Sequence, residues 1–396
     1  MQSLLILGRQ PKLGTAELES LYGPDKIQPL GDNGCLLDID WTKVNFNELG
    51  GSLKLAQVIS VLDTTNWHQL SNELNKILGE QLSKLDESKV NLGISSYGLD
   101  VNPRQLLATG LSLKKYAKSI NRSIRVIPNK NTYLSSAQAI HNKLAGSQGI
   151  EFILVKQEGR TIVATTRAVQ DIEAYSTRDR QRPKRDARVG MLPPKLAQII
   201  INLARANNSQ NQQQKKLILL DPFCGSGVVL QEARLMGLDV LGSDIDERMI
   251  EFSKDNMAWL DNMIPPGQVR YELEIADATQ HQWLHKFDII ACETFLGPPL
   301  SSLPPASQLK QIVQNCNNQV KLFLQNVANQ TKNGFRMCVA VPAWKTKNDF
   351  LHLPVIASLD KLGYNRINLE HAQTNELIYH RPGQIVAREL VTLERK

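Results

Sequence analysis

The run LILLDPFCGSGVVLQEA, residues 217–233, is the feature that most constrains the fold. An apolar stretch ends in Asp221, a turn with two glycines follows, and a helical pattern begins near Val228. Gly225 and Gly227 let the backbone approach a ligand closely, and the N–H groups at a helix start face that ligand. The run is not GxGxxG and lacks the Lys-Ser/Thr of a phosphate-binding loop, which disfavours a dinucleotide or ATP.

Two more acidic residues follow apolar stretches farther along the chain. Asp244 lies 23 residues after Asp221, in GSDID, where an acid can accept hydrogen bonds from both hydroxyls of a ribose. Asp277, in ADAT, is suited to an adenine amino group. Strand and helix patterns alternate throughout this region, which predicts a doubly wound parallel α/β sheet. The alternative is a generic strand–turn–helix fold with incidental acids.

The chain before this region divides by pattern into shorter segments. Residues 1–65 predict a small α+β unit with ferredoxin-like order, and residues 66–170 a second α+β unit. Residues 171–190 contain the basic run RDRQRPKRDAR and predict a linker; residues 191–396 form the last domain. The run NNSQNQQQKK, 207–216, predicts a solvated loop.

Composition limits the function classes. None of the apolar runs reaches the roughly 18 residues of a membrane span, and the N-terminal run is too short for a signal peptide. Five cysteines without a CxxC pair predict free thiols in a reducing cytoplasm, and seven histidines form no metal-like cluster. A net charge of +7 favours an anionic partner.

Three motifs resemble one family. The series DPFCGSG, GSDID and AD resembles the cofactor half of class I S-adenosylmethionine-dependent methyltransferases. The run YSTRDRQRPKRDARVGMLPPKLAQIIINLA resembles the start of the catalytic domain in THUMP-containing tRNA guanosine-N2 methyltransferases, and LIYHRPGQIVARELVTLER is similar to their last strands. The resemblance implies a ferredoxin-like domain and a THUMP domain before a Rossmann-like methyltransferase domain. It also implies tRNA as substrate, and some members of the family need a small activating subunit.

The resemblance assigns the cofactor site by position. The residues implied are Asp221, Pro222, Phe223, Gly225 and Gly227 for the methionine part, Asp244 with Ile245 for the ribose, and Asp277 with Ala278 for the adenine. The alternative for Asp244 and Asp277 is a role as strand-end caps.

The catalytic loop departs from the family pattern. Relatives carry Asp-Pro-Pro-Tyr after the fourth strand, and this chain has Glu293-Thr294-Phe295-Leu296. By position, Glu293 and the backbone near Thr294 would hold a guanine amine, and Phe295 would stack on the base. Two alternatives stay open, namely a different base or amine as substrate, and an RNA-binding protein without catalysis. Cys292 as a nucleophile is disfavoured, because a small thiol at the end of an apolar strand is commonly buried.

Basic residues predict where RNA binds. Residues 111–130 contain six basic residues and no acidic one, and part of them recur at helical spacing. The expected RNA-binding residues are Lys114, Lys115, Lys118, Arg122, Arg125, Arg178, Arg180, Arg182, Lys184 and Arg185. The alternatives are a solvated helix face for the first group and a brace between domains for the second.

Overall fold

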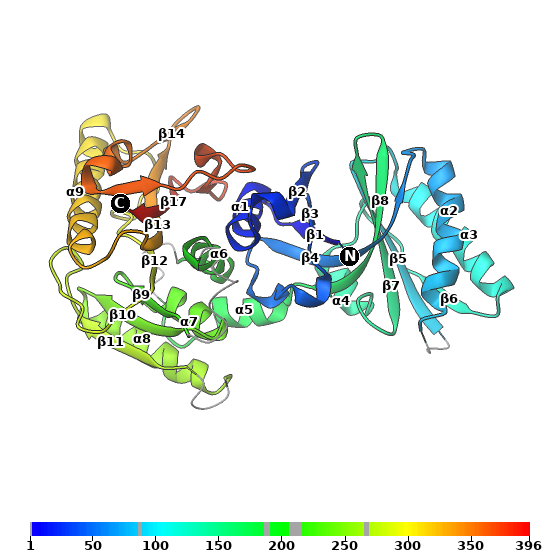
Figure 1. Cartoon of the computed structure of the whole chain (residues 1–396), viewed down its shortest axis with the longest axis horizontal. Helices are drawn as coiled ribbons and strands as arrows, with labels where there is room; N and C mark the ends of the chain where they lie inside the picture. Colours follow the sequence, from blue (N-terminus) through cyan, green and yellow to red (C-terminus); the bar gives the residue numbers. More distant parts are fainter. Residues whose placement is uncertain (1, 86–88, 186–190, 206–215, 265–268) are drawn as a thin grey trace. The chain divides into compact units, whose positions relative to one another are not determined.

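The computed structural model describes residues 2–85, 89–185, 191–205, 216–264 and 269–396, which fold into two compact units (Figure 1). Unit 1 comprises Met1–Pro11, Pro24–Asn47 and Gly51–Ile172, and unit 2 comprises Lys12–Gly23, Glu48–Gly50 and Glu173–Lys396. Most of the expected Asn/Gln-rich loop and residues 186–190 of the expected linker lie outside the described residues. Within the described ranges, no helix is both long and apolar enough to cross a bilayer.

Unit 1 is built on one eight-stranded sheet with the order β2-β3-β1-β4-β8-β7-β5-β6. Its strands are β1 (Ser3–Leu7), β2 (Ile27–Leu30), β3 (Gly34–Leu37), β4 (Ser52–Leu62), β5 (Lys89–Tyr97), β6 (Ser123–Val126), β7 (Gly149–Gln157) and β8 (Arg160–Val169). Its helices are α2 (Trp67–Leu82), α3 (Pro103–Ser119) and α4 (Ser136–His141). Leucines at helical spacing on α2 and α3 are buried together against β5 and β7, so these two helices cover the sheet at that end.

The predicted boundary near residue 65 does not divide this sheet. Strand β4 pairs antiparallel with β8, from Lys54↔Val169 to Leu62↔Thr161. The strands of residues 1–65 and 66–170 therefore share one sheet, and the expectation of two separate units is corrected. Hydrophobic periodicity along the chain cannot reveal a pairing between strands this far apart in sequence. The assignment of these residues as ferredoxin-like and THUMP domains stays a prediction.

A buried ion pair crosses the middle of the unit 1 sheet. Lys54 on β4 is 2% exposed and pairs with Glu151 on β7, which is fully buried. Ser95 and Thr166 donate hydrogen bonds to the two oxygens of Glu151 at 2.6 and 2.7 Å. Lys54 also donates to the carbonyl of Leu134 at 2.8 Å. Because both charges are paired and hydrogen-bonded, burial here does not leave an orphan charge.

Unit 2 contains a second sheet, whose main path has the order β11-β10-β9-β12-β13-β17-β15. Its strands are β9 (Ile218–Asp221), β10 (Asp239–Asp244), β11 (Tyr271–Ile275), β12 (Ile289–Glu293), β13 (Arg336–Lys345), β14 (Phe350–Leu351), β15 (Tyr364–Arg366), β16 (Ile378–Tyr379) and β17 (Val386–Arg395). Its helices are α1 (Pro11–Tyr22, of which Pro11 falls in unit 1), α5 (Ile172–Arg180), α6 (Pro194–Arg205), α7 (Val228–Leu235), α8 (Glu247–Asp261) and α9 (Ala306–Ala328). The strands from β11 to β13 are parallel, and β17 runs antiparallel to β13. The predicted doubly wound α/β class is confirmed.

Both faces of this sheet are covered, as the alternation of side chains shows. Leu219 and Ala291 lie in the apolar cluster with α6, α7 and α8, whereas Leu220 and Ile290 lie in the cluster with α9. Successive residues of a strand point to opposite faces, so β9 and β12 contribute to both clusters. Figure 1 shows β9, β10 and β11 side by side with α7 and α8. Strand order reverses at β9, and ligands of such sheets bind at the carboxyl ends of the strands beside that reversal.

Helix α1 is part of unit 2 rather than of unit 1, except for its first residue. Glu17 on α1 is fully buried and accepts hydrogen bonds from the backbone of Gly50 and the side chain of Asn202, at 2.9 and 2.8 Å. Arg336 donates to the hydroxyl of Ser20 at 2.7 Å. The expected N-terminal domain 1–65 is therefore corrected a second time, because its first helix packs on α6. The expected linker is corrected too, since its first half is helix α5 of unit 2.

Candidate active site

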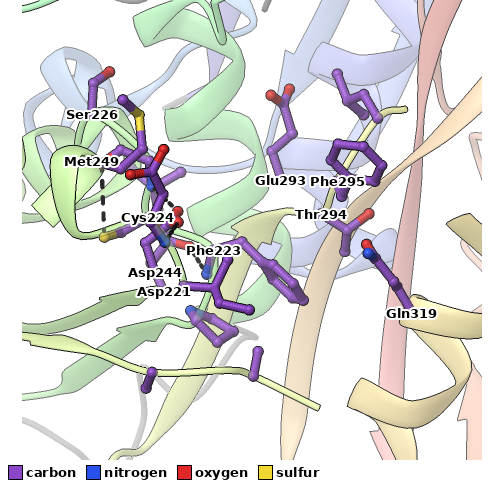
Figure 2. A pocket seen from close by; sticks show the side chains of 18 of the residues that line it. Asp221, Phe223, Cys224, Ser226, Asp244, Met249, Glu293, Thr294, Phe295 and Gln319 are labelled. Carbon is purple, nitrogen blue, oxygen red and sulfur yellow. Dashed lines mark hydrogen bonds between the residues drawn. The ribbon is translucent and has the colours of Figure 1, made fainter. Parts of the chain in front are cut away.

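A cavity of about 610 Å³ lies in unit 2 at the carboxyl ends of the parallel strands. The ends of β9, β10 and β12 contribute Asp221, Asp244 and Glu293, and the segment after β11 contributes Asp277. Figure 2 shows Glu293 and Phe295 on one side of the cavity and Asp244 and Ser226 on the other. Four acids that are far apart in sequence thus meet around one space.

The turn between β9 and α7 depends on two glycines in left-handed backbone conformations. Gly225 has φ +51° and Gly227 has φ +81°. A Cβ at Gly227 would lie 2.8 Å from the hydroxyl of Ser253, so a side chain there would force Ser253 to move as well as strain the backbone. Ser253 in turn donates to the carbonyl of Gly225 at 2.7 Å. The turn is therefore held closely against α8.

Burial raises the pKa of Asp221 and of Asp244, and hydrogen bonds from backbone N–H groups act against both rises. Asp221 is 2% exposed and accepts a hydrogen bond from the backbone N–H of Phe223 at 3.1 Å. Burial raises its pKa well above the usual range, and the charges of Asp244 and Glu293 add to that rise. Burial also raises the pKa of Asp244, while N–H groups of Asp246 and Gly225 bind its two oxygens at 3.0 and 2.9 Å and oppose the rise. A carboxylate has about four lone-pair sites, so Asp244 keeps capacity for ribose hydroxyls.

The pKa of Asp277 is shifted in the opposite direction. The side chain and backbone of Thr279 donate hydrogen bonds to its Oδ1 at 2.7 and 2.9 Å, and these bonds lower the pKa of Asp277. The carboxylate is therefore ionised over a wide pH range and can accept a hydrogen bond from an amine. Ile245 is 69% exposed and lies with Ala278 in the cavity lining, which provides apolar surface for a flat ring.

Glu293 at the end of β12 is paired with a basic residue. Arg388 on β17 is 3% exposed, and its Nε donates to Oε1 of Glu293. Burial raises the pKa of Glu293, and the charge of Arg388 acts against that rise. The next residue, Thr294, is 3% exposed and is fixed by bonds from its N–H and hydroxyl to the carbonyl of Ala340, at 3.0 and 3.3 Å. Phe295 follows with 45% of its surface exposed.

The cysteines near the cavity are not poised as nucleophiles. Cys292 is fully buried and Cys224 is 5% exposed. Burial raises the pKa of both thiols well above the usual range, and nearby acids raise it further. Because the thiolate is the reactive form, neither side chain is suited to covalent catalysis. All five cysteines are free and buried.

The cavity brings together most of the residues expected from sequence. Its lining includes Asp221, Pro222, Phe223, Gly225, Asp244, Ile245, Asp277, Ala278, Glu293, Thr294 and Phe295. Gly227 does not line it and starts α7 instead. The lining residues that sequence reasoning missed include Met191, Arg248, Met249, Gln319 and Leu322. No short motif marks these, because they come from helices and loops whose position is set by packing.

The residues expected to bind RNA separate into two classes. Lys114, Lys115 and Lys118 on α3 and Arg125 on β6 are exposed, and Arg122 is half-buried with a hydrogen bond to the carbonyl of Leu85. In the basic segment, Arg180 and Arg185 are exposed and Lys184 is half-buried. Arg182 is 2% exposed and Arg178 binds Glu232, so these two side chains point into unit 2. We therefore correct the expectation for Arg178 and Arg182.

Comparison with known proteins identifies the unit that carries the cavity. Residues 213–380 match a family model described as a methyltransferase domain. Residues 213–380 thus carry a methyltransferase domain. The strand order of unit 2 agrees with this, and the whole chain is similar in fold to the crystal structure of TrmN from Thermus thermophilus, with a TM-score of 0.52, 15% identity and 100% of both chains covered.

Two curated relatives are similar to this chain in sequence. The tRNA (guanine(10)-N2)-dimethyltransferase of Methanothermobacter thermautotrophicus is 29% identical over 153 residues, which is 39% of each protein. The enzyme of the same name from Pyrococcus abyssi is 29% identical over 222 residues, which is 53% of this chain and 61% of the relative. The matched stretches thus span less than two thirds of these relatives.

The cavity of the methyltransferase domain fits S-adenosylmethionine, the methyl donor of this class. Among the described residues that line it, five are Asp or Glu and one, Arg248, is basic. The donor carries a sulfonium and an ammonium group, so an acidic cavity with a buried Asp221 suits its charge. Asp244 has acceptor sites for the ribose, and Ile245 and Ala278 offer apolar surface beside Asp277 for the adenine.

Proposed function

We propose that this chain transfers a methyl group from S-adenosylmethionine to the exocyclic N2 amine of a guanosine in tRNA. The observation that carries the proposal is the juxtaposition of Glu293, a carboxylate at the end of β12, with the exposed ring of Phe295 in the same cavity as Asp221 and Asp244. The names of the two curated relatives support the choice of substrate.

The proposed roles follow from the positions of the groups. A guanine ring stacks on Phe295, and Glu293 accepts a hydrogen bond from its amine. The lone pair of that amine is delocalised into the ring, so holding its hydrogens helps to turn the lone pair toward the methyl group. Thr294 contributes a fixed backbone, because its N–H and hydroxyl are bound to Ala340. Orientation of this kind supplies much of the rate enhancement when the methyl donor is already reactive.

The proton balance of the transfer involves Glu293. S-adenosylmethionine supplies a methyl group on a positively charged sulfur, and the C–S bond that breaks leaves a neutral thioether. The amine nitrogen gains a C–N bond and must lose one proton. A carboxylate within hydrogen-bond reach of that nitrogen is placed to accept the proton directly or through one water.

We propose that two groups of basic residues contact tRNA, one on each unit, formed by the exposed basic residues together with the half-buried Lys184. In unit 1 these are Lys114, Lys115, Lys118 and Arg125, and in the basic segment Arg180, Lys184 and Arg185. Cations on an exposed face bind phosphates without reading sequence, so they would orient the tRNA rather than select the base. A tRNA substrate and five free cysteines fit an activity in the cytoplasm.

The test is an incubation of the full chain with an unmodified tRNA transcript and methyl-labelled S-adenosylmethionine, followed by nucleoside mass spectrometry. We expect N2-methylguanosine from the wild type and from Glu251→Ala, a control on the exposed face of α8, and none from Glu293→Ala. Another methylated nucleoside would contradict the proposed base. No product, although tRNA and donor both bind, would contradict catalysis by this chain alone, and product only after a cell extract is added would identify a need for a second subunit.

A further inference from the structure

Arg388 reaches the catalytic carboxylate from a strand that does not pair with β12. Strand β13 separates the two, with Ala340 opposite Glu293 and Pro342 opposite Arg388 in the register. These residues share one face of the sheet, and the short side chains of Ala340 and Pro342 leave room for Arg388 to cross. The ion pair joins positions 95 residues apart in the chain.

The pair engages only part of the carboxylate. The Nε atom of Arg388 binds Oε1 of Glu293, and Oε2 has no hydrogen-bond partner among the described residues. The side chain of Glu293 keeps 17% exposure, and Figure 2 shows it beside Phe295 at the cavity. One oxygen is therefore anchored and the other is available to a ligand.

We infer that Arg388 is a positioning residue for the transfer: it anchors Oε1 of Glu293 and leaves Oε2 aimed at the substrate amine. This inference rests on the proposed function. Glu has one more methylene than the Asp of the resembled family, and therefore more rotamers to restrict. A guanidinium contact from β17 restricts them, and it keeps the carboxylate charged in a buried place.

The surroundings of Glu293 show why Arg388 is needed to keep its carboxylate charged. Arg388 faces it from β17, the acid Asp221 faces it from the end of β9, and the thiol of Cys292 precedes it on β12. Burial favours the protonated form of Glu293, and the charge and hydrogen bond of Arg388 oppose it. A protonated Glu293 could not accept the proton of the amine, so loss of Arg388 would move the pH at which the acceptor is available upward.

The first experiment compares Arg388→Met, Arg388→Lys and wild type in kcat and KM from pH 5.5 to 9.5. For Arg388→Met we expect a fall in kcat at pH 7 of about 100-fold, the lower end of what loss of a general base causes, with the acid limb of the profile moved to higher pH and kcat recovering toward pH 9. KM for S-adenosylmethionine should change little, and Arg388→Lys should restore most of the rate. A loss that is equal at every pH, or a gain in rate, would overturn the inference.

The second experiment does not depend on tRNA methylation. Protein labelled with ¹³C at the glutamate carboxyl carbons is titrated by NMR, and the signal of Glu293 is assigned by its absence in Glu293→Gln. We expect the midpoint of that signal to lie at higher pH in Arg388→Met than in wild type, with Arg388→Lys between them. Identical midpoints in folded wild type and variants would overturn the inference, whereas a wild type that titrates as expected but makes no product would overturn only the proposed function.

Discussion

Arg178 on α5 binds the buried carboxylate of Glu232 on α7 through two hydrogen bonds, of 2.7 Å from Nε and 3.3 Å from Nη2. Glu232 is 1% exposed. The guanidinium carbon of Arg178 also lies 4.5 Å from the centre of the Tyr175 ring. Arg178 lies in a segment that was expected to bind RNA. Its side chain instead binds an acid inside unit 2, on α7, the helix that follows the glycine turn.

Loss of this pair should destabilise unit 2. Arg178→Met leaves Glu232 buried without its cation, which typically costs about 3–5 kcal/mol of unfolding free energy. Burial already raises the pKa of Glu232 and Arg178 lowers it, so in the variant that pKa rises further. The folded variant then holds a proton more firmly than the unfolded chain, and the loss should be smaller at pH 5 than at pH 8. Urea unfolding at both pH values tests this, with exposed Arg180→Gln as the control; equal losses at both values would refute the ionic explanation.

Exposed lysines on α3 should contribute to the binding of tRNA and should not affect the binding of S-adenosylmethionine. Replacing Lys114 and Lys118 together by Gln should weaken tRNA binding and reduce the slope of log affinity against log salt by about 0.7–0.9 for each phosphate that is no longer neutralised. Lys76→Gln on α2, where the side chain is 75% exposed, is the matched control. Filter binding from 50 to 300 mM salt measures the slope, and an unchanged slope would exclude these lysines from the RNA surface.

Asp221 should lower the stability of the ligand-free protein and raise its affinity for S-adenosylmethionine. Asp221→Asn keeps an acceptor for the N–H of Phe223 and removes a buried carboxyl whose pKa is raised, so the ligand-free protein should gain about 1–3 kcal/mol at pH 8. An acid with a raised pKa lowers the stability of the folded state as pH rises from its unfolded pKa to the raised folded value, so the gain should shrink toward pH 5. The dissociation constant for S-adenosylmethionine should rise about 10-fold or more.

Thermal melting and calorimetry measure these two effects of Asp221→Asn. Asp360→Asn, an exposed acid in the same unit, should change neither quantity. A variant that is less stable at pH 8, or that binds the donor as wild type does, would show that Asp221 serves the fold rather than the ligand.

Asn256 should link the basic segment to the donor site. This fully buried side chain accepts from the N–H of Lys184 at 2.9 Å and donates to the carbonyls of Lys184 and Ser226 at 3.0 and 2.8 Å. Asn256→Ala leaves these backbone groups unpaired and frees the glycine turn, so donor affinity should fall about 10-fold. Amide hydrogen exchange at residues 178–185 should also become faster. Bound S-adenosylmethionine should slow this exchange less in the variant than in wild type.

The control for Asn256 is Asn262→Ala, at the exposed end of the same helix. It should leave donor affinity and exchange at residues 178–185 unchanged. If Asn256→Ala increases exchange throughout unit 2 to the same degree, its role is general stability and no link between the two segments exists.

Local patterns were sufficient for the frame of the site. Apolar runs ending in Asp221 and Asp244 predicted strands whose carboxyl ends meet, because the rules for parallel sheets need no distant information. The two glycines predicted the turn, since each of them has a positive φ that other residues rarely adopt. Glu293 was located by its place after an apolar strand, although its loop differs from the family motif.

Tertiary structure decided what each charged residue does. Arg388 meets Glu293 only because β13 places two strands in register, and Arg178 turns from an expected RNA-binding residue into the partner of a buried acid. Helix α1 joins unit 2 through Glu17, and β4 joins β8 across the expected domain boundary. The sequence by itself determined the strands, the turn and the acids, because these depend on periodicity and backbone conformation. The pairing of charges depends on distances across the fold, which only the packed chain sets.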